Sequence, residues 1–208
     1  MTRRSGSPDA GFTLVELMMA STMGAIITSV IATAVVVSLR NADATGNRLA
    51  VSHDAQIAQS WFTTDAQSSD GVDTDFSGTG SCGTSTPVVV FRWTSRAAYP
   101  PNDYRVVTYG VNVDGTTGER QLVRESCTGT TGFATVALTD TVVLAHNLTG
   151  TPAPTCTYAT SPTSDACVSD APAHAFTTVR LVVTSQLVAR DKTDTFAFTL
   201  VGDRRSSQ

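Results

Sequence analysis

Residues 11–30 read GFTLVELMMASTMGAIITSV, and they begin an apolar segment long enough to cross a membrane. No charged residue occurs in the 23 positions from Leu17 to Leu39. An α-helix needs roughly 20 apolar residues to span the hydrocarbon core of a bilayer. Glu16 stands near the start of this segment, where an ionisable side chain is costly and is therefore expected to have a function.

The rest of the 208-residue chain is long enough for one domain with its own core. The net charge is −4, of which Arg3, Arg4 and Asp9 ahead of Phe12 contribute +1. The remainder therefore carries 12 − 17 = −5 charges. An acidic body offers no electrostatic footprint for nucleic acid, so we do not expect nucleic acid as a direct partner.

The basic residues Arg3 and Arg4 also resemble the start of a secretory signal peptide. The apolar stretch is too long for the core of such a peptide, and the RNADATGNR that follows Leu39 has only Ala42 and Ala44 to mimic a cleavage site. A retained membrane span is therefore the preferred interpretation. Basic residues ahead of the span favour a cytoplasmic N-terminus, which puts the body outside the cytoplasm.

All four cysteines follow the span, at Cys82, Cys127, Cys156 and Cys167. An even number of cysteines in a translocated domain predicts two disulfides, with unpaired buried thiols as the alternative. Of the three possible pairings we prefer Cys82–Cys127 with Cys156–Cys167, because the second would staple a short loop rich in Pro, Thr and Ser. No CxxC occurs, so zinc binding or thioredoxin-like chemistry has little support.

Residues 11–17, GFTLVEL, stand between a short polar, basic leader and the apolar run. This pattern resembles the type IV prepilin signature. The resemblance implies that a prepilin peptidase cuts after Gly11, on the cytoplasmic side, and that the new first residue, Phe12, is N-methylated. It also implies that Glu16 is retained for assembly.

Electrostatics indicates a role for Glu16 in the assembly of cleaved subunits. Cleavage would create a charged α-amine on Phe12, and either charge alone in lipid would be costly. Each cancels the other if Glu16 of one subunit meets the amine of a neighbour. A buried ion pair adds little net stability but penalises misregistration, so Glu16 would set the axial register of parallel helices. The alternative is a plain single-pass anchor, with Glu16 at the membrane interface.

The helix is expected to continue beyond the membrane. Residues 47–67 contain no proline or glycine, and Ala50, Asp54, Ile57 and Trp61 follow one another at helical spacing. We expect Ile57, Trp61 and Phe62 to pack against a sheet, and the helix to end near Ser68.

The remaining chain has the composition of β-strands and turns. Residues 104–113 and 118–126 predict one hairpin, and residues 175–189 and 195–204 predict another. Residues 87–93 predict a strand, residues 133–148 one or two strands, and residues 68–80 and 149–172 loops.

The expected fold class is therefore α+β and pilin-like, with a long N-terminal helix packed on an antiparallel β-sheet domain. The segments are a leader (1–11), an assembly and transmembrane helix (12–39), its amphipathic continuation (40–68) and a β-rich extracytoplasmic domain (69–208). The hairpin sequences YRVVTYGVN and RQLVRES are similar to those of minor pilins and pseudopilins of the W/J type.

The sequence offers no catalytic motif. His53, His146 and His174 are scattered, and neither HExxH nor GxSxG occurs. Asp70, Asp73 and Asp75 lie in a glycine-containing stretch, but their spacing differs from that of a calcium loop, so a solvated loop is preferred. We therefore expect no enzyme activity, no cofactor and no metal.

The resemblance implies a structural subunit of a type IV pilus or related filament. Its expected partners are the prepilin peptidase and N-methyltransferase, other pilin or pseudopilin subunits, an inner-membrane assembly platform and membrane lipid. The precursor would be a single-pass protein of the cytoplasmic membrane, moving to the filament and cell surface on assembly. The alternatives are a filament-tip binding or adhesion module, and a pseudopilin of type II secretion or of DNA uptake.

Overall fold

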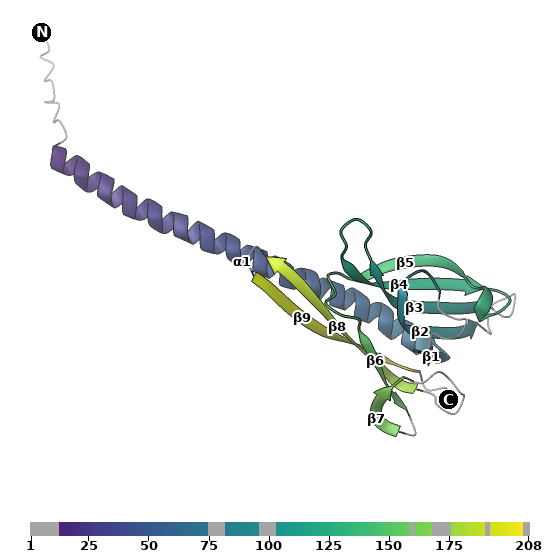
Figure 1. Cartoon of the computed structure of the whole chain (residues 1–208). Helices are drawn as coiled ribbons and strands as arrows, with labels where there is room; N and C mark the ends of the chain where they lie inside the picture. Colours follow the sequence, from purple (N-terminus) through teal and green to yellow (C-terminus); the bar gives the residue numbers. More distant parts are fainter. Residues whose placement is uncertain are drawn as a thin grey trace, which may run out of the picture. The chain divides into compact units, whose positions relative to one another are not determined.

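The structure is a computed structural model that describes residues 13–74, 82–95, 103–158, 161–167, 176–189 and 192–205. The chain divides into two compact units, Met1–Gly46 and Asn47–Gln208, which are treated separately below. Helix α1 (Leu14–Ser68) contributes to both units, and all the strands belong to the second (Figure 1).

Helix α1 begins at a side-chain cap. The Thr13 hydroxyl oxygen accepts a hydrogen bond from the backbone N–H of Glu16 (3.3 Å), and the Thr13 carbonyl accepts the Leu17 N–H (3.2 Å). Threonine is a favoured N-cap because it satisfies a backbone donor that the first helical turn leaves free. The helix ends at Ser68, as predicted, just before Ser69 and Asp70, which connect it to the strand that begins at Gly71.

The first sheet is five-stranded and antiparallel, in the order β1-β2-β3-β4-β5 (Figure 1). It confirms the hairpin predicted at 104–113 and 118–126, whose second strand begins two residues later than expected. Its turn is held by Asp114, whose carboxylate oxygen accepts the N–H groups of Thr116 and Thr117. The strands are β1 (Gly71–Asp73), β2 (Thr86–Ser95), β3 (Asp103–Val113), β4 (Arg120–Gly129) and β5 (Ala137–Ala145), and a 3-10 turn, η1 (Phe133–Thr135), precedes β5.

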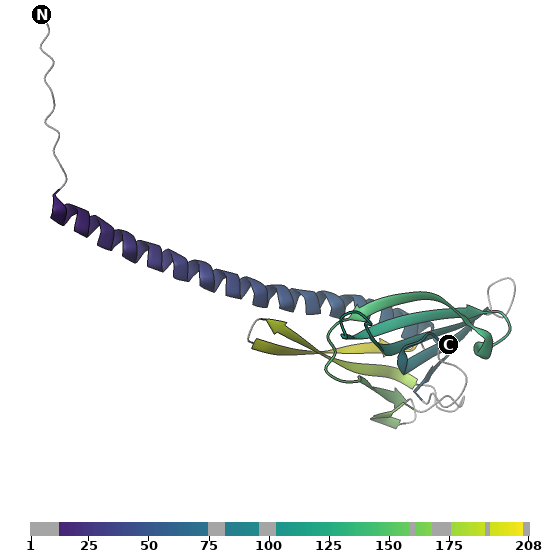
Figure 2. The same cartoon turned by 45° about the horizontal axis from the view of Figure 1, so that its top comes forward.

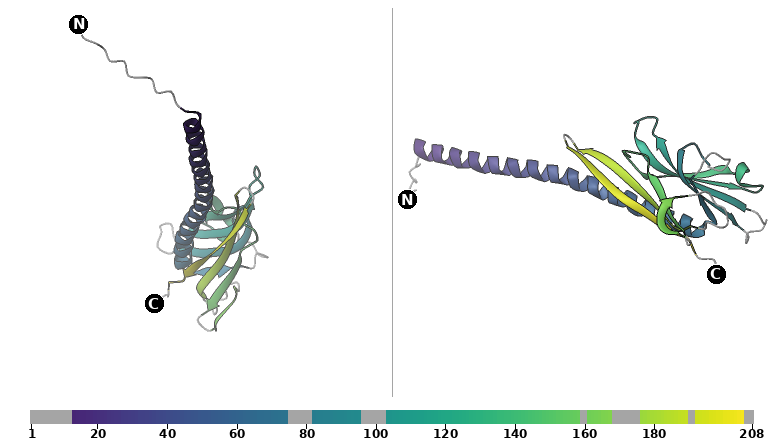
Figure 3. Two further views of the ribbon diagram at one scale, coloured as in Figure 1. Left: turned by 90° about the vertical axis from the view of Figure 1, so that its left-hand side faces the viewer. Right: turned by 60° about the horizontal axis from the view of Figure 1, so that its bottom comes forward.

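The second sheet is four-stranded, in the order β7-β6-β8-β9. Strands β8 and β9 form the long hairpin that was predicted near the C-terminus (Figure 2). The right-hand view of Figure 3 separates this sheet from the first. The strands are β6 (Ala153–Tyr158), β7 (Ser161–Ala166), β8 (Phe176–Ala189) and β9 (Lys192–Asp203).

Two loop predictions were wrong. Strand β1 lies within 68–80, where Val72 pairs with Phe91 and is buried in the core. Strands β6 and β7 lie within 149–172, although this stretch is rich in proline. Pro154 is tolerated because β7 pairs with β6 only from Thr155 onward, so that Pro154 has a single neighbouring strand.

The core of the second unit is built where α1 meets both sheets. Phe62 of α1 makes edge-to-face contacts with Phe91 of β2 (5.4 Å between ring centroids) and Tyr109 of β3 (5.1 Å). Phe176 of β8 and Leu181 join the same buried cluster. Such aromatic pairs add stability beyond the area that they bury.

The face of α1 that packs on the sheets differs from the predicted stripe. Ile57 is half-buried and Phe62 fully buried, but Ala50 is exposed and Trp61 retains 38% of its surface. The most buried α1 residues are instead Ala58, Phe62, Asp65 and Ala66. The prediction is confirmed for Ile57 and Phe62 and was wrong for Ala50 and Trp61, because the small residues Ala58 and Ala66 let the helix approach the sheets closely on a neighbouring face.

Gly202 of β9 shows how close this approach is. A Cβ atom at Gly202 would lie 2.4 Å from the Cβ of Ala66 and 3.3 Å from the ring of Phe62. No side chain fits there without moving the helix. The pairing of small residues therefore sets the spacing between α1 and β9.

Candidate functional site

The α1 segment of the first unit exposes an apolar surface. All side chains described over residues 13–42 are exposed, including large apolar ones such as Leu14 (75%) and Met23 (65%). Within the described residues, one helix is long and apolar enough to cross a membrane, and its most apolar window has a mean hydropathy of 2.1. Such a surface requires lipid or other protein to cover it.

Five hydroxyl-bearing side chains within this segment bond to their own helix. The hydroxyl groups of Thr22, Thr28 and Thr33 donate to backbone carbonyls three or four residues earlier, and Ser21 and Ser29 do the same. Internal hydrogen bonds remove the cost of placing hydroxyl groups in hydrocarbon. The hydroxyl-bearing residues of the segment are therefore compatible with a membrane.

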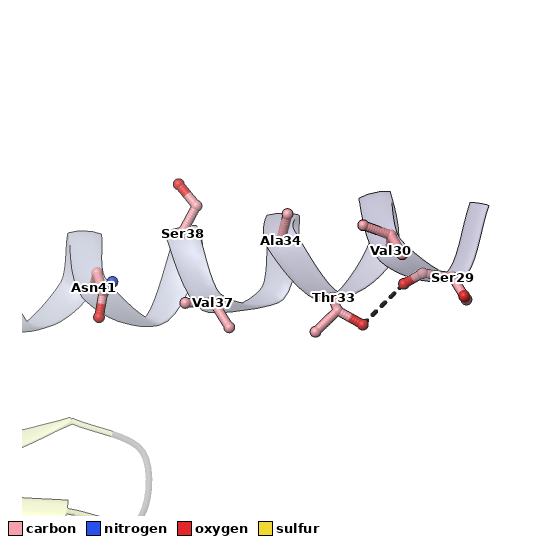
Figure 4. A pocket seen from close by; sticks show the side chains of 7 residues that line it. All are labelled: Ser29, Val30, Thr33, Ala34, Val37, Ser38 and Asn41. Atoms are coloured by element: carbon pink, nitrogen blue, oxygen red, sulfur yellow. Dashed lines mark hydrogen bonds between the residues drawn. The ribbon is translucent and has the colours of Figure 1, made fainter. Parts of the chain in front are cut away.

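One face of this segment is lined by small residues. Ser29, Thr33, Ala34 and Ser38 lie around a shallow hollow on α1, together with Val30, Val37 and Asn41 (Figure 4). Thr33 is turned toward the helix backbone by its hydrogen bond to the carbonyl of Ser29 (2.8 Å). Small residues at helical spacing let the backbone of another membrane helix come close.

Glu16 is placed at the very start of α1. Its backbone N–H is held by Thr13, and no described residue makes a hydrogen bond or an ion pair with its carboxylate. A negative charge in the first helical turn interacts favourably with the helix dipole. Gly11 and Phe12 lie outside the described residues, so their geometry relative to Glu16 is not part of the structure.

Residues 7–32 match the family model described as the prokaryotic N-terminal methylation motif, which includes Gly11, Phe12 and Glu16. The chain is type IV pilin-like. The long α1 and the antiparallel sheets give it an α+β, pilin-like architecture. The motif and the apolar helix together make it a single-pass, membrane-anchored protein. No curated protein and no solved structure matches the chain.

The four cysteines form two disulfides in the second unit. Cys82, ahead of β2, is bonded to Cys127 of β4, and Cys156 of β6 is bonded to Cys167, which follows β7. This is the pairing that was preferred from the sequence. The first disulfide fastens the 82–85 segment to the sheet, and the second closes the β6–β7 hairpin.

A buried carboxylate reinforces the first of these attachments. Glu125 is 3% exposed and accepts hydrogen bonds from the N–H of Thr84 (2.9 Å), the N–H of Ser85 (3.3 Å) and the Ser85 hydroxyl. Gly83 adopts a φ of 86°, and a Cβ there would collide with the Glu125 carboxylate. Glu125 therefore acts as a structural anchor for the 82–85 segment.

A second buried charge cluster joins α1 to the first sheet, and it was not predicted from the sequence. Arg124 of β4 makes a bidentate pair with Asp65 of α1, with distances of 2.7 Å and 2.9 Å. The Tyr109 hydroxyl donates to the same carboxylate at 2.6 Å, and the Arg124 guanidinium lies 4.4 Å from the ring centroid of Trp61. An aspartate on an otherwise apolar helix face was the only available hint.

Burial shifts the ionisation of this cluster. Burial first, and then the charge of Asp65, raise the pKa of Tyr109 well above its ordinary value. Burial lowers the pKa of Arg124, but its hydrogen bond and charge interaction with Asp65 outweigh that effect and raise it overall. The phenol of Tyr109 therefore stays neutral and the Arg124 guanidinium stays charged across the physiological range, as expected of a structural element.

The other candidate groups form no site among the described residues. No cluster of three or more His, Cys, Asp or Glu side chains there could hold a metal ion. Asp70 accepts the Thr94 N–H, and Asp73 pairs with Arg92 at 2.9 Å. Among the histidines, His146 contacts Asp54 at 3.0 Å and His53 is exposed. Asp75 and His174 lie outside the described residues.

Proposed function

We propose that the chain is a minor pilin or pseudopilin, a structural subunit of a type IV pilus or related filament. The observation that carries this proposal is the methylation motif at residues 7–32, which covers the capped start of α1 and part of its exposed, apolar segment. A prepilin peptidase would cleave between Gly11 and Phe12 and methylate the new N-terminus. The role of the protein would then be assembly, and not catalysis.

The position of Glu16 supports a role in assembly. It is the third residue after the Thr13 cap, so that its carboxylate projects from the first turn of the helix. This turn would lie next to the α-amine that cleavage creates on Phe12. An unpaired carboxylate in lipid would be costly, and the amine of a neighbouring subunit would neutralise it. Glu16 would therefore fix the axial position of one subunit relative to the next.

The small-residue face of α1 fits the same role. Ser29, Thr33, Ala34 and Ser38 would allow close helix–helix packing in the membrane or the filament core. The hydroxyl groups of Ser29 and Thr33 are already bonded within the helix, so packing would not leave these two without partners. The partners would be other pilin-like subunits, delivered by an inner-membrane assembly platform.

The two disulfides favour an extracytoplasmic location for the β-rich unit, because disulfides persist mainly in oxidising compartments. Arg3 and Arg4 would remain in the cytoplasm by the positive-inside rule. The β3–β4 hairpin, which resembles that of minor subunits of the W/J type, favours a subunit of low abundance.

The mature N-terminus tests the processing step. Mass spectrometry of the protein purified from membranes of a host with a prepilin peptidase should find N-methylated Phe12 as the first residue. Gly11→Leu should leave the leader attached, while the matched change Gly6→Leu inside the leader should be cleaved normally. An intact Met1 in the unmodified chain, or cleavage near residue 44, would overturn the proposal.

Glu16 can be tested separately from cleavage. Glu16→Gln keeps the size of the side chain and removes the charge, so we expect normal processing but a large loss of incorporation into filaments. Thr13→Ser preserves the helix cap and should have no effect on either step. Filaments that contain the Glu16→Gln chain at the normal level would refute the register argument.

A further inference from the structure

Strand β9 has one edge without a neighbouring strand. It is the last strand in the order β7-β6-β8-β9, so β8 pairs with only one side of it. At Val201 the open side is occupied by Gln59 of α1. The Gln59 amide donates to the Val201 carbonyl at 2.7 Å, and the Val201 N–H donates to the Gln59 amide oxygen at 3.0 Å. A side chain thus takes the place of the next strand at this residue.

The edge is open beyond Val201. Backbone groups alternate in direction along a strand, so the N–H and C=O of Thr199, Ala197 and Thr195 point the same way as those of Val201. The register with β8 is continuous over this stretch, and no described residue hydrogen-bonds these outward groups. Residues 195–199 include no Pro, Lys or bulge, which are the usual protections of an exposed edge.

The sequence of the open edge reads the same in both directions. It is Thr195-Phe196-Ala197-Phe198-Thr199. A second copy that approaches with its own β9 antiparallel would place Ala197 opposite its counterpart and Thr195 opposite Thr199. Each of these is a hydrogen-bonded pair, because the groups concerned point outward on both copies. The edge is therefore complementary to itself.

The side chains agree with this pairing. Phe196 and Phe198 are half-buried on one face of β9, while Thr195, Ala197 and Thr199 are exposed on the other. Antiparallel pairing about Ala197 would set Phe196 against Phe198 of the second copy, and aromatic cross-strand pairs stabilise a sheet.

An open groove of about 580 Å³ lies beside the edge and gives the second strand room. Phe198 and Thr199 line it on the strand side, and α1 residues between Ser52 and Thr64 line it on the other. None of the lining residues is charged, so no repulsion between like charges opposes a second copy of the same strand.

We propose that the β-rich unit forms a two-fold symmetric dimer, in which two β9 strands pair antiparallel about Ala197. The contact uses the same surface on both copies, so it closes on itself and does not propagate. Gln59 limits its length, because Val201 is already hydrogen-bonded and pairing stops at Thr199. The dimer does not depend on cleavage of the leader or on the filament role proposed above.

Cysteine cross-linking of the full chain in detergent micelles tests the contact. The native cysteines are in disulfides, so Ala197→Cys adds a reactive thiol that the two-fold axis brings within about 6 Å of its copy. A short bifunctional thiol reagent should give a covalent dimer. Val182→Cys is the matched control, because Val182 is 50% exposed and lies across from Thr199 on β8, one strand further from the axis. Equal cross-linking of the two variants would overturn the proposal.

A second pair of variants tests the backbone bonding. Ala197→Pro removes an outward N–H without removing a bond to β8, so native mass spectrometry should show loss of the dimer. Ala197→Ser keeps the N–H and should keep the dimer. The unfolding midpoint of each variant establishes that the unit is folded. A folded Ala197→Pro chain that remains dimeric would refute edge pairing, and normal processing after Gly11 in both variants would leave the filament proposal intact.

Discussion

Replacing Arg124 by methionine should strongly destabilise the β-rich unit. The Asp65 and Arg124 side chains are 5% and 7% exposed, and their bidentate pair is the charged contact between α1 and β4. Methionine keeps the unbranched stem but leaves the Asp65 carboxylate buried without its counter-charge. Breaking a buried pair in this way costs about 3–5 kcal/mol of the free energy of unfolding.

The double variant Asp65→Leu with Arg124→Met distinguishes the loss of a buried ion pair from two independent losses of packing. Two independent losses would add to about 6–10 kcal/mol, whereas apolar replacement of a whole buried ion pair is often neutral. The Tyr109 hydroxyl would lose its acceptor, which costs about 1–3 kcal/mol. We therefore expect the double variant to be more stable than either single variant.

Denaturant unfolding of the full chain in detergent micelles measures these differences. Fluorescence reports on the site directly, because the Arg124 guanidinium lies 4.4 Å from the ring centroid of Trp61. Arg120→Met on the same strand is the control, since among the described residues the Arg120 side chain bonds to the exposed Thr151, and should cost less than about 1 kcal/mol. A loss below about 1 kcal/mol for Arg124→Met, or additive losses in the double variant, would refute the reasoning.

Three further predictions concern the same unit. The pKa of Tyr109 is raised in the folded state, so its contribution to the free energy of unfolding is complete below about pH 10 and is lost as the pH rises further. Above that pH, the denaturant midpoint of the unmodified chain should therefore fall more steeply with pH than that of Tyr109→Phe. Replacing Cys82 and Cys127 by serine should cost about 4 kcal/mol in the chain-entropy account, since the disulfide closes a sequence separation of 45 residues; an unchanged midpoint would contradict this. Gly202→Ala should lower the free energy of unfolding by about 1–3 kcal/mol, because the added methyl group would collide with Ala66. A thermal unfolding midpoint equal to that of the unmodified chain would contradict this.

Much of the architecture could be predicted from local patterns in the sequence. The uncharged run from Leu17 to Leu39 and the helix end near Ser68 depend on local hydropathy and on turn chemistry. The two long hairpins follow from β-branched runs on either side of turn residues. Strands β6 and β7 were not predicted, because proline disfavours strands. In the structure, proline is tolerated where a strand residue pairs with a neighbouring strand on one side only.

The sequence by itself determined the apolar segment long enough to cross a membrane, the methylation motif at residues 7–32 and the general α+β class. Only the tertiary structure decided which face of α1 is buried, because Trp61 and Phe62 are adjacent and both are large aromatic residues. It also decided that Asp65 pairs with Arg124, which is 59 residues away. Hydropathy and backbone preference are properties of neighbouring residues, whereas the partner of a buried charge is fixed by the packing of distant segments.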